Sequence, residues 1–313
     1  MYPDATRPYN GIFVAEQMEA IKKYHSDVDF DVCYIDGGKG KGEYLKSISY
    51  VNRKIRKGKY NLVHVHFGLS GLYLLSPMCA KIPTLVTFHG SDILPAGGNG
   101  WLTVNISRYV ARKADACITL NEDMDAMVRR FNENTFVVPC AVDVDVFQPS
   151  CVPHHSEVVQ IVFPCNHEMA VKDYPLFCKV LEILRNVYGI RCEEKELAGM
   201  SRQQVAELFN EADLMLMTSK SEGSPQAVKE ALACNLPVVS TPVGDVSNLL
   251  LGVRDCYVAQ KHDAEELARL VVKSLHRSLE GMTGIEKIKM LKLDAKSVAD
   301  RIYDIYKNVA LIR

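Results

Sequence analysis

The sequence lacks the motifs of several common classes of protein. No apolar run is long enough to cross a membrane as a helix, and no secretory leader is visible. The ten cysteines include no C-x-x-C pair, which excludes a zinc ribbon, and most lie in apolar runs, which favours a reducing cytoplasm. No G-x-G-x-x-G opens a helix after a strand, which argues against a dinucleotide-dependent dehydrogenase. The formal net charge is only -1, so the chain has no overall attraction for nucleic acid.

One cluster of positive charge interrupts this balanced composition. One interpretation of the cluster is the solvated end of a helix, and the other is a contact with anionic lipid or with an acidic acceptor. Because the cysteines favour a reducing cytoplasm, the protein is expected there. The second interpretation of the cluster adds a peripheral contact with the inner face of the cell membrane. The cluster consists of Arg53, Lys54, Arg56, Lys57 and Lys59.

Apolar runs of strand length alternate along the chain with segments of helical periodicity. Several runs lack the period of two that marks a half-exposed strand, which is typical of strands buried on both faces of a parallel sheet. The alternation predicts an α/β protein with doubly wound sheets. Strands are predicted over 30–35, 62–67, 84–88, 116–120, 135–138, 159–164, 214–218, 237–240 and 256–259, and helices over 12–24, 101–113, 123–132, 174–187, 202–212, 225–233, 264–275 and 297–309.

A linker divides these elements into two groups. Residues 147–156 hold two prolines and several polar side chains between apolar strands, as is typical of a domain boundary. We therefore predict two Rossmann-like domains, over residues 1–150 and 151–296, and a last helix within 297–313 that can cross back to the first domain. The second domain is short, with room for only one brief strand between Gly189 and Ser201.

The chain opens with a segment that is typical of a loop. A doubly wound domain usually begins with a hydrophobic strand, whereas residues 1–11 hold polar residues, prolines and a glycine. We therefore expect that the first strand is missing and that the coding region begins upstream. Loss of that strand would leave unpaired edges in the first sheet. An in-frame hydrophobic strand in the upstream DNA would support this expectation, and a stop codon just before Met1 would exclude it.

The densest group of chemically informative residues follows the buried run 214–218. Ser224 suits an N-cap and Pro225 the first helical position, so the predicted helix begins at the carboxyl end of a strand. Ligands bind at that edge of open α/β sheets. The amides at the helix start can bind sugar hydroxyls or phosphate oxygens, helped by the positive end of the helix dipole. These amides belong to Gly223, Ser224, Gln226 and Ala227.

Two carboxylates accompany this helix start. Glu222 lies in the loop and Glu230 on the helix, and a carboxylate can accept two hydrogen bonds from adjacent hydroxyls. One would suit a transferred sugar ring and the other a ribose. Without a ligand, Glu222 would stabilise the helix dipole, and Glu230 would be an exposed helix residue, as Lys229 is expected to be.

The spacing of these acids is part of a longer pattern. Glu222-x7-Glu230 is followed by Ala231-Leu-Ala-Cys-Asn-Leu-Pro-Val-Val-Ser240 and then by Gly244. The stretch resembles the signature E-G-x-x-x-x-x-x-E-A-x-A-x-G-x-P-V-V of glycosyltransferase family 4, a family of retaining enzymes with the GT-B fold. Asn235 stands where the family has glycine, and this exchange is mild because asparagine tolerates the left-handed conformation of a helix C-cap.

Other stretches are similar to further parts of the family pattern, so the resemblance covers nearly the whole chain. Residues 82–92 resemble a T-x-H-G-x-D stretch, in which His89 would contact the transferred sugar. A lone histidine at a strand end is otherwise a hydrogen-bonded structural residue. Residues 112–121 and 139–149 resemble a strand and the domain junction of the family. Asn10 and Gly11 fall where the family has a glycine loop near the donor phosphates and the acceptor.

The resemblance implies a metal-independent transfer in which cations and helix ends stabilise the leaving diphosphate. The family uses an arginine and a lysine after the first strand of its second domain. Lys172 fits the lysine, whose point charge would stabilise the transition state; without that role it would be a solvated residue ahead of a helix. The arginine is absent, and Asn166 or His167 occupies its approximate place. A neutral His167 would help less than an arginine.

Two further histidines carry a weaker signal. His64 and His66 alternate on one predicted strand, so their side chains can face the same side. Two histidines without a third ligand make a poor metal site. They are interpreted as cleft or core residues.

The sequence therefore predicts a GT-B glycosyltransferase with two Rossmann-like domains, the first on the acceptor side and the second binding the donor. It is expected to move a sugar from a UDP- or GDP-sugar to a glycan or lipid-linked acceptor with retention, without a metal or other cofactor, in the synthesis of cell-surface polysaccharide or glycolipid. The missing arginine and the short second domain leave open a non-catalytic relative that binds a nucleotide sugar or a partner protein. The predicted catalytic residues are Glu222, Lys172 and His89, and the predicted donor-binding residues are Glu230, Gly223, Ser224, Pro225, Gln226, Ala227, His167, Gly11 and Asn10.

Overall fold

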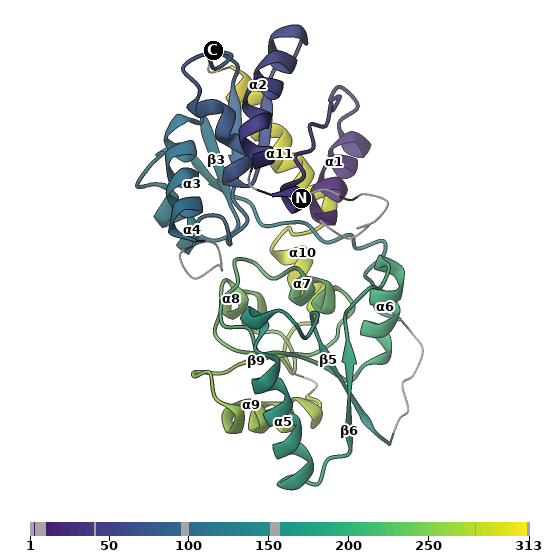
Figure 1. Ribbon diagram of the computed structural model, residues 1–313. Coiled ribbons are helices and arrows are strands. Elements are labelled where there is room, and N and C mark those ends of the chain that lie inside the picture. The colour runs from purple at the N-terminus through teal and green to yellow at the C-terminus, as the bar shows by residue number, and fades with distance from the viewer. Residues whose placement is uncertain are drawn as a thin grey trace. The chain divides into compact units, whose positions relative to one another are not determined.

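The computed structural model describes residues 3, 11–40, 42–94, 100–150, 157–278 and 280–311. These residues form two compact units, and each unit is a parallel sheet covered by helices (Figure 1). The α/β prediction is therefore confirmed. Unit 1 combines Met1–Ala141 with Ala295–Arg313, and unit 2 is Val142–Asp294, whereas the sequence placed domain boundaries after residues 150 and 296.

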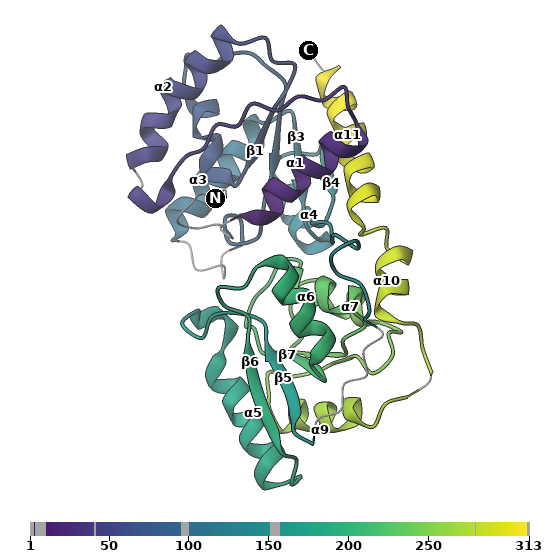
Figure 2. The same cartoon turned by 90° about the vertical axis from the view of Figure 1, so that its right-hand side faces the viewer.

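Unit 1 is built on four parallel strands in the order β1-β2-β3-β4. Successive residues of a strand face opposite sides, so Leu85 packs in the cluster that contains α1 and α11, and Val86 packs in the cluster that contains α2 and α3. Figure 2 shows α1 and α11 side by side on one face. The strands are β1 (Val63–His66), β2 (Thr84–Thr87), β3 (Ala116–Thr119) and β4 (Thr135–Val137), and the helices are α1 (Ile12–Tyr24), α2 (Gly42–Lys57), α3 (Trp101–Lys113), α4 (Glu122–Val128) and the short 3₁₀ segments η1 (Gly37–Lys39) and η2 (Gly68–Leu75).

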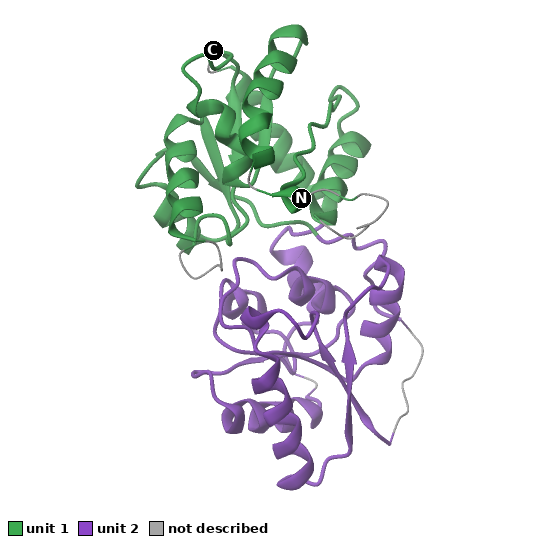
Figure 3. Ribbon diagram, in the orientation of Figure 1, with its two compact units in different colours: residues 1–141, 295–313 green, residues 142–294 purple. Residues whose placement is uncertain are grey.

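The last helix of the chain belongs to unit 1, although it follows unit 2 in the sequence (Figure 3). Helix α11 (Ala295–Ala310) carries apolar residues at helical spacing. Val298, Ile302 and Val309 are buried in the same cluster as Ile21 and Leu85. The predicted return of this helix to the first half of the chain therefore has a physical cause, which is burial of its apolar face.

Unit 2 is built on five strands in the order β6-β5-β7-β8-β9, and all of its neighbouring strands are parallel. Its sheet is apolar on both faces: Val162 packs with α6 and α7, and Ile161 packs with α5 and α9. The strands are β5 (Val159–Phe163), β6 (Cys192–Glu196), β7 (Leu214–Met217), β8 (Val238–Ser240) and β9 (Tyr257–Val258), and the helices are η3 (Ala170–Lys172), α5 (Tyr174–Asn186), α6 (Arg202–Glu211), α7 (Gln226–Ala233), α8 (Val246–Leu250), α9 (Ala264–Leu275) and α10 (Gly284–Met290).

In the first half of the chain, one predicted strand is absent and one helix was not predicted. Residues 30–35 form no strand, because this stretch makes no ladder with a neighbour among the described residues, and Val32 and Tyr34 are exposed. Only the basic end of α2 was interpreted as helical. The rest of this helix was not predicted, because polar and charged residues separate its apolar ones. Within the described part of the chain, no helix combines the length and the apolar character that a membrane span requires.

Candidate functional site

The loop between β7 and α7 brings the predicted donor-binding residues to the carboxyl end of the unit 2 sheet. The helix start differs from the prediction by one residue: Pro225 is the N-cap, and Gln226 is the first helical residue. Ser224 is not the cap, because its Oγ donates instead to Oδ2 of Asp245 at 2.7 Å. The amides of Gln226 and Ala227 still occupy the first turn, where the helix dipole favours an anion.

A second turn, at Gly244 and Asp245, packs against the backbone of this loop. Gly244 has a φ of 51°, and a Cβ atom there would lie 2.3 Å from the carbonyl oxygen of Gly223. The amide of Asp245 donates to that same oxygen at 3.3 Å. Only glycine allows this close approach, so Gly244 fixes the position of the loop that carries Glu222.

Burial also shifts the pKa of a carboxyl group next to this loop, that of Asp245. Burial raises the pKa of the Asp245 carboxyl, against the hydrogen bond from Ser224 and the positive charge of Lys229, which both lower it. Lys229 was expected to be solvated, but it is fully buried. That expectation is wrong because α7 packs inside unit 2, where α6, α8 and α10 contact it. The buried ammonium group of Lys229 therefore partly offsets the rise in the pKa of Asp245.

Glu222 and Lys172 meet although they are 50 residues apart in sequence. Nζ of Lys172 lies 2.6 Å from Oε1 of Glu222, and these side chains are 18% and 14% exposed. The segment that ends at Lys172 is fastened to the end of β7, because Thr218 Oγ1 donates to the carbonyl oxygen of Lys172 at 2.9 Å and the amide of Lys220 donates to that of Val171 at 2.8 Å. The structure thus places a cation and an acid together beside the start of α7.

Glu230 is buried rather than exposed on the helix surface. Only 3% of the residue is accessible, and its Oε1 accepts a hydrogen bond from Nη2 of Arg202 at 2.6 Å. The guanidinium of Arg202 also lies 4.6 Å from the centre of the Phe147 ring. Arg202 is not among the predicted site residues. The capping box of Ser201 predicts the start of α6, but the contact of Arg202 with Glu230 depends on how α6 packs against α7.

His167 is surrounded by carboxylates. Its Nε2 bonds Glu194, and its backbone amide donates to Oε1 of Glu196 at 3.1 Å. Its ring stacks on Tyr174 with centroids 3.8 Å apart, and the Tyr174 hydroxyl donates to Glu194 at 2.8 Å. These acids come from β6, whose end lies beside the end of β5. Any positive charge on His167 would therefore have acidic partners within the protein.

The predicted sugar contact in unit 1, His89, lies just after β2. Its amide donates to Oδ1 of Asp92 at 2.9 Å, and the amide of Gly68 donates to Oδ2 at 2.9 Å. Burial raises the pKa of Asp92 to about 6, although these backbone hydrogen bonds oppose the rise. Asp92 thus holds together the loops that follow β1 and β2.

The side chain of His89 lies in a cluster of rings. Its Nε2 is 3.1 Å from Nδ1 of His66, and the rings of Phe13 and Phe67 pack on it with centroids 4.8 Å and 4.4 Å away. His64 bonds Tyr306 and Thr87 at 2.7 Å each. Among the described residues, no group of three or more histidines, cysteines or acids has the arrangement of a metal site.

The predicted glycine loop is described only in part. Gly11 is buried and has a φ of 70°, and it forms the N-cap of α1, where its carbonyl oxygen accepts from the amide of Val14 at 3.0 Å. Its left-handed conformation explains the glycine. Asn10 lies outside the described residues.

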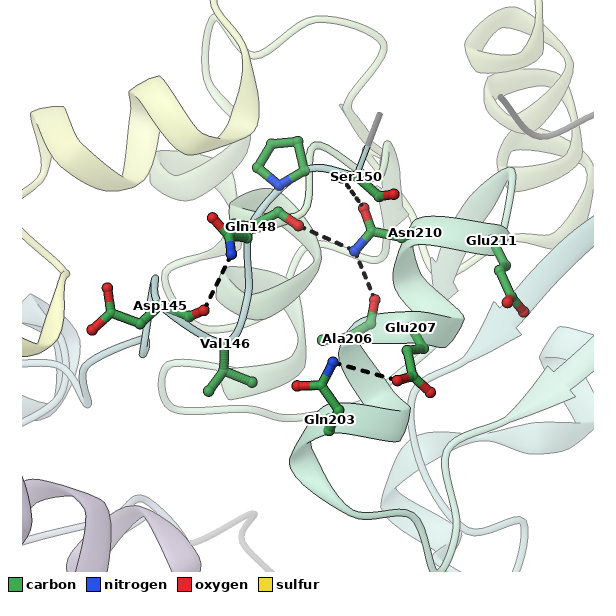
Figure 4. A pocket seen from close by; sticks show the side chains of 10 residues that line it. Asp145, Val146, Gln148, Ser150, Gln203, Ala206, Glu207, Asn210 and Glu211 are labelled. Atoms are coloured by element: carbon green, nitrogen blue, oxygen red, sulfur yellow. Dashed lines mark hydrogen bonds between the residues drawn. The ribbon is translucent and has the colours of Figure 1, made fainter. Parts of the chain in front are cut away.

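A recess of about 480 Å³ lies elsewhere in unit 2, between α6 and residues 145–150 (Figure 4). None of the predicted site residues lines it. Its polar groups bond one another: Asn210 accepts from the amide of Ser150 at 2.6 Å and donates to the carbonyl oxygen of Gln148 at 3.1 Å. The start of α7, with its charged pairs and helix end, remains the better candidate for an anionic sugar ligand.

Two family models match the chain, one in each half. The model described as Glycosyltransferase Family 4 matches residues 13–146, and the model described as Glycosyl transferases group 1 matches residues 179–277. These ranges include His89, Glu222 and Glu230, whereas Lys172 lies between them.

Individual proteins are similar to the chain over most of its length. It is 22% identical over 261 residues to the N-acetyl-alpha-D-glucosaminyl L-malate synthase of Bacillus anthracis, covering 70% of this chain and 68% of that protein. It is 22% identical over 278 residues to the putative teichuronic acid biosynthesis glycosyltransferase TuaC of Bacillus subtilis (strain 168), covering 80% and 71%. The solved structure of Anabaena HepE in complex with UDP-glucose is similar with a TM-score of 0.70 at 14% identity, covering 95% of this chain and 96% of that one.

Proposed function

Because the chain belongs to glycosyltransferase family 4 and has the GT-B fold, we propose that it holds a nucleotide sugar at the start of α7 and transfers the sugar with retention and without a metal ion. The chain is a glycosyltransferase of glycan synthesis that uses a nucleotide-sugar donor. The relatives do not favour the non-catalytic alternative, since their names are those of transferases and a synthase.

The donor site in this proposal is the region of unit 2 around Glu222 and Glu230. The observation that carries it is that both acids lie inside the fold, each bound to a cation at 2.6 Å, instead of facing bulk solvent. An ion pair with so little exposure needs further hydrogen bonds to offset its desolvation, and sugar or ribose hydroxyls could supply them. The amides of Gln226 and Ala227 and the positive helix end would bind the diphosphate.

Lys172 would act on the leaving group. When the bond from the anomeric carbon to the diphosphate oxygen breaks, the diphosphate keeps the electron pair, and a cation beside it stabilises that charge. The acceptor oxygen then bonds the anomeric carbon from the same face, and its proton passes to the departing diphosphate. Glu222 holds the Lys172 ammonium in place for this step.

The first test is a binding screen. UDP- and GDP-sugars are titrated into the protein by calorimetry, and transfer or hydrolysis of the winner is followed by release of the nucleotide. UDP-N-acetylglucosamine and UDP-glucose come first, because names of similar proteins contain these groups.

Variants of the three charged residues then locate the site. Lys172→Met should lower kcat about 100-fold, as loss of one preorganised charge does, and Glu230→Gln should weaken donor binding at least about tenfold, since one charged hydrogen bond is lost. Glu222→Gln should do both. Glu211→Gln, an exposed acid of α6, is the control and should behave as wild type. Full activity in all three site variants would refute the assignment.

We also propose that the exposed face of α2 contacts anionic lipid. Leu45, Tyr50 and the adjacent Met78 are 65%, 53% and 71% exposed, and the guanidinium of Arg56 binds the carbonyl oxygen of Met78. Exposed Arg53 and Lys57 lie on the same helix. Apolar side chains among unburied cations match a surface with a negatively charged headgroup layer over a hydrocarbon layer.

A further inference from the structure

The ring of His89 is held by a histidine from the neighbouring strand. His66 is the last residue of β1, and because β1 and β2 are parallel with His66 opposite Thr87, His66 and His89 lie at the same edge of the sheet. Nδ1 of His66 is 3.1 Å from Nε2 of His89, and the rings are 5.3 Å apart at 27°. Among the described residues, Nδ1 of His89 has no hydrogen-bond partner.

The backbone around this pair is strained. Phe67 has a φ of 69°, which is rare for a residue with a side chain and is unfavourable for the backbone. This conformation places the Phe67 ring against His89, with centroids 4.4 Å apart, while Gly68 donates to Asp92. Such strain persists only where the surroundings determine the geometry, and it is concentrated at functional sites.

The shared hydrogen bond links the protonation of the two rings. Desolvation lowers the pKa of His66 to about 3 and that of His89 well below its usual value, so both rings are neutral near pH 7. Two neutral imidazoles in contact share one proton in their bond. If His66 donates it, His89 carries its own proton on Nδ1 and offers a donor to the ligand; in the opposite case it offers an acceptor.

We propose that His66 is a positioning residue that fixes the orientation and the tautomer of His89, so that Nδ1 of His89 meets one hydroxyl of the transferred sugar with a defined role. This inference rests on the proposed function and on the prediction, from the family resemblance, that His89 contacts the transferred sugar. His66 acts only through His89. It is distinct from His64, which lies on the same strand but bonds Tyr306 and Thr87.

The test is ¹⁵N NMR of the imidazole nitrogens in histidine-labelled protein, with His89 assigned from a His89→Gln variant. Wild type should show one tautomer of His89. In His66→Leu, which keeps bulk but removes the hydrogen bond, the two ring nitrogens should average between tautomers. His66→Asn, whose amide lies near the position of Nδ1, should restore one tautomer, and the control His64→Leu should leave the His89 signals unchanged. Averaged signals in wild type, or unchanged signals in His66→Leu, would overturn the proposal.

Kinetics supply the second measurement. His66→Leu should lower kcat about tenfold, the value of roughly one hydrogen bond, with the donor KM within about twofold. His66→Asn should recover most of the loss, and His64→Leu should lower Tm rather than kcat. Equal losses in the Leu and Asn variants would contradict positioning through a hydrogen bond. A wild type with one His89 tautomer but no transfer would refute the proposed function and not the contact between the two histidines.

Discussion

At the scale of single residues, unit 2 pairs each signature acid with a cation from a distant part of the sequence. Lys172 reaches Glu222 from the segment after β5, and Arg202 reaches Glu230 from the start of α6. Removal of one partner of such a pair leaves a charge with poor solvation, which costs more than the pair itself contributes. This is why the proposed variants are isosteric Gln or Met changes, compared by binding as well as by folding.

Gly244 offers a test of the loop that carries Glu222. Gly244→Ala should destabilise the protein by about 1–3 kcal/mol and weaken donor binding, because a Cβ atom would collide with Gly223 and displace the loop. Gly252→Ala is the matched control, since Gly252 also has a positive φ of 76° but nothing within 4 Å of its Cβ position. Thermal melts and donor titrations of both variants check this. Equal donor affinity in the two variants would show that the loop does not bind the donor.

The burial of His64 should make the free energy of unfolding depend on pH. Desolvation holds its pKa well below 6.5, with His66 and His89 lowering it further, so the unfolded chain binds a proton that the folded chain excludes. The free energy of unfolding should therefore fall below pH 6.5, by up to about 1.4 kcal/mol per pH unit for one such group. Asp92, whose pKa is raised to about 6, has the opposite sign: its contribution to stability is present at low pH and is lost as the pH rises from about 4 to 6.

Denaturant titrations of wild type and His64→Gln between pH 8 and pH 5 isolate the contribution of His64. The difference at pH 8 reports the lost hydrogen bonds to Tyr306 and Thr87. As the pH falls, wild type should lose stability faster than the variant, by roughly 1 kcal/mol between pH 6.5 and 5.5. A difference that stays constant over this range would mean that His64 is not held neutral by burial.

At the scale of helices and strands, local patterns predicted most elements. Helices α1, α3 and α9 begin and end where their apolar periodicity does. The segment 30–35 has the composition of a strand, yet a strand also needs a neighbour to bond, which sequence alone does not supply. Helix α2 was not predicted because polar and charged residues separate its apolar residues, although Ile48, Val51 and Ile55 lie at helical spacing.

In the site, too, the sequence predicted residues that belong to a local pattern but not contacts that depend on tertiary packing. The sequence could predict Glu222, Glu230 and Lys172 because they belong to a spaced pattern, and the structure pairs Glu222 with Lys172. It could not predict Arg202, whose contact with Glu230 depends on how α6 packs against α7. The cap at Ser224 failed for a related reason: Asp245, distant in sequence, competes for its hydroxyl.

The proposed contact of α2 with anionic lipid can be tested by the binding of the protein to vesicles. Vesicles with phosphatidylglycerol should sediment wild type more strongly than neutral phosphatidylcholine vesicles, and Arg53→Gln with Lys57→Gln should weaken this binding at least about tenfold, since each basic residue contributes about 1 kcal/mol. The control is Lys289→Gln with Lys292→Gln, two exposed lysines of unit 2. Equal binding by both double variants, or binding only to soluble acidic polysaccharide, would contradict a lipid contact.

At the scale of the whole molecule, the predicted site residues are divided between two units that each have their own core. Glu222, Glu230, Lys172 and His167 lie in unit 2, whereas His89 and Gly11 lie in unit 1. We expect Glu230 of unit 2 to determine donor affinity, Lys172 and Glu222 of the same unit to affect the rate of transfer as well, and the His89 cluster of unit 1 to affect the rate.

The central claim is that the first turn of α7 and the acids at 222 and 230 bind the donor. A crystal structure with the UDP- or GDP-sugar selected by the screen tests it directly. We predict that the diphosphate lies within hydrogen-bonding distance of Lys172 Nζ and of the amides of Gln226 and Ala227, with ribose hydroxyls on Glu230. A donor bound only to unit 1, or in the recess beside Asn210, would contradict the account.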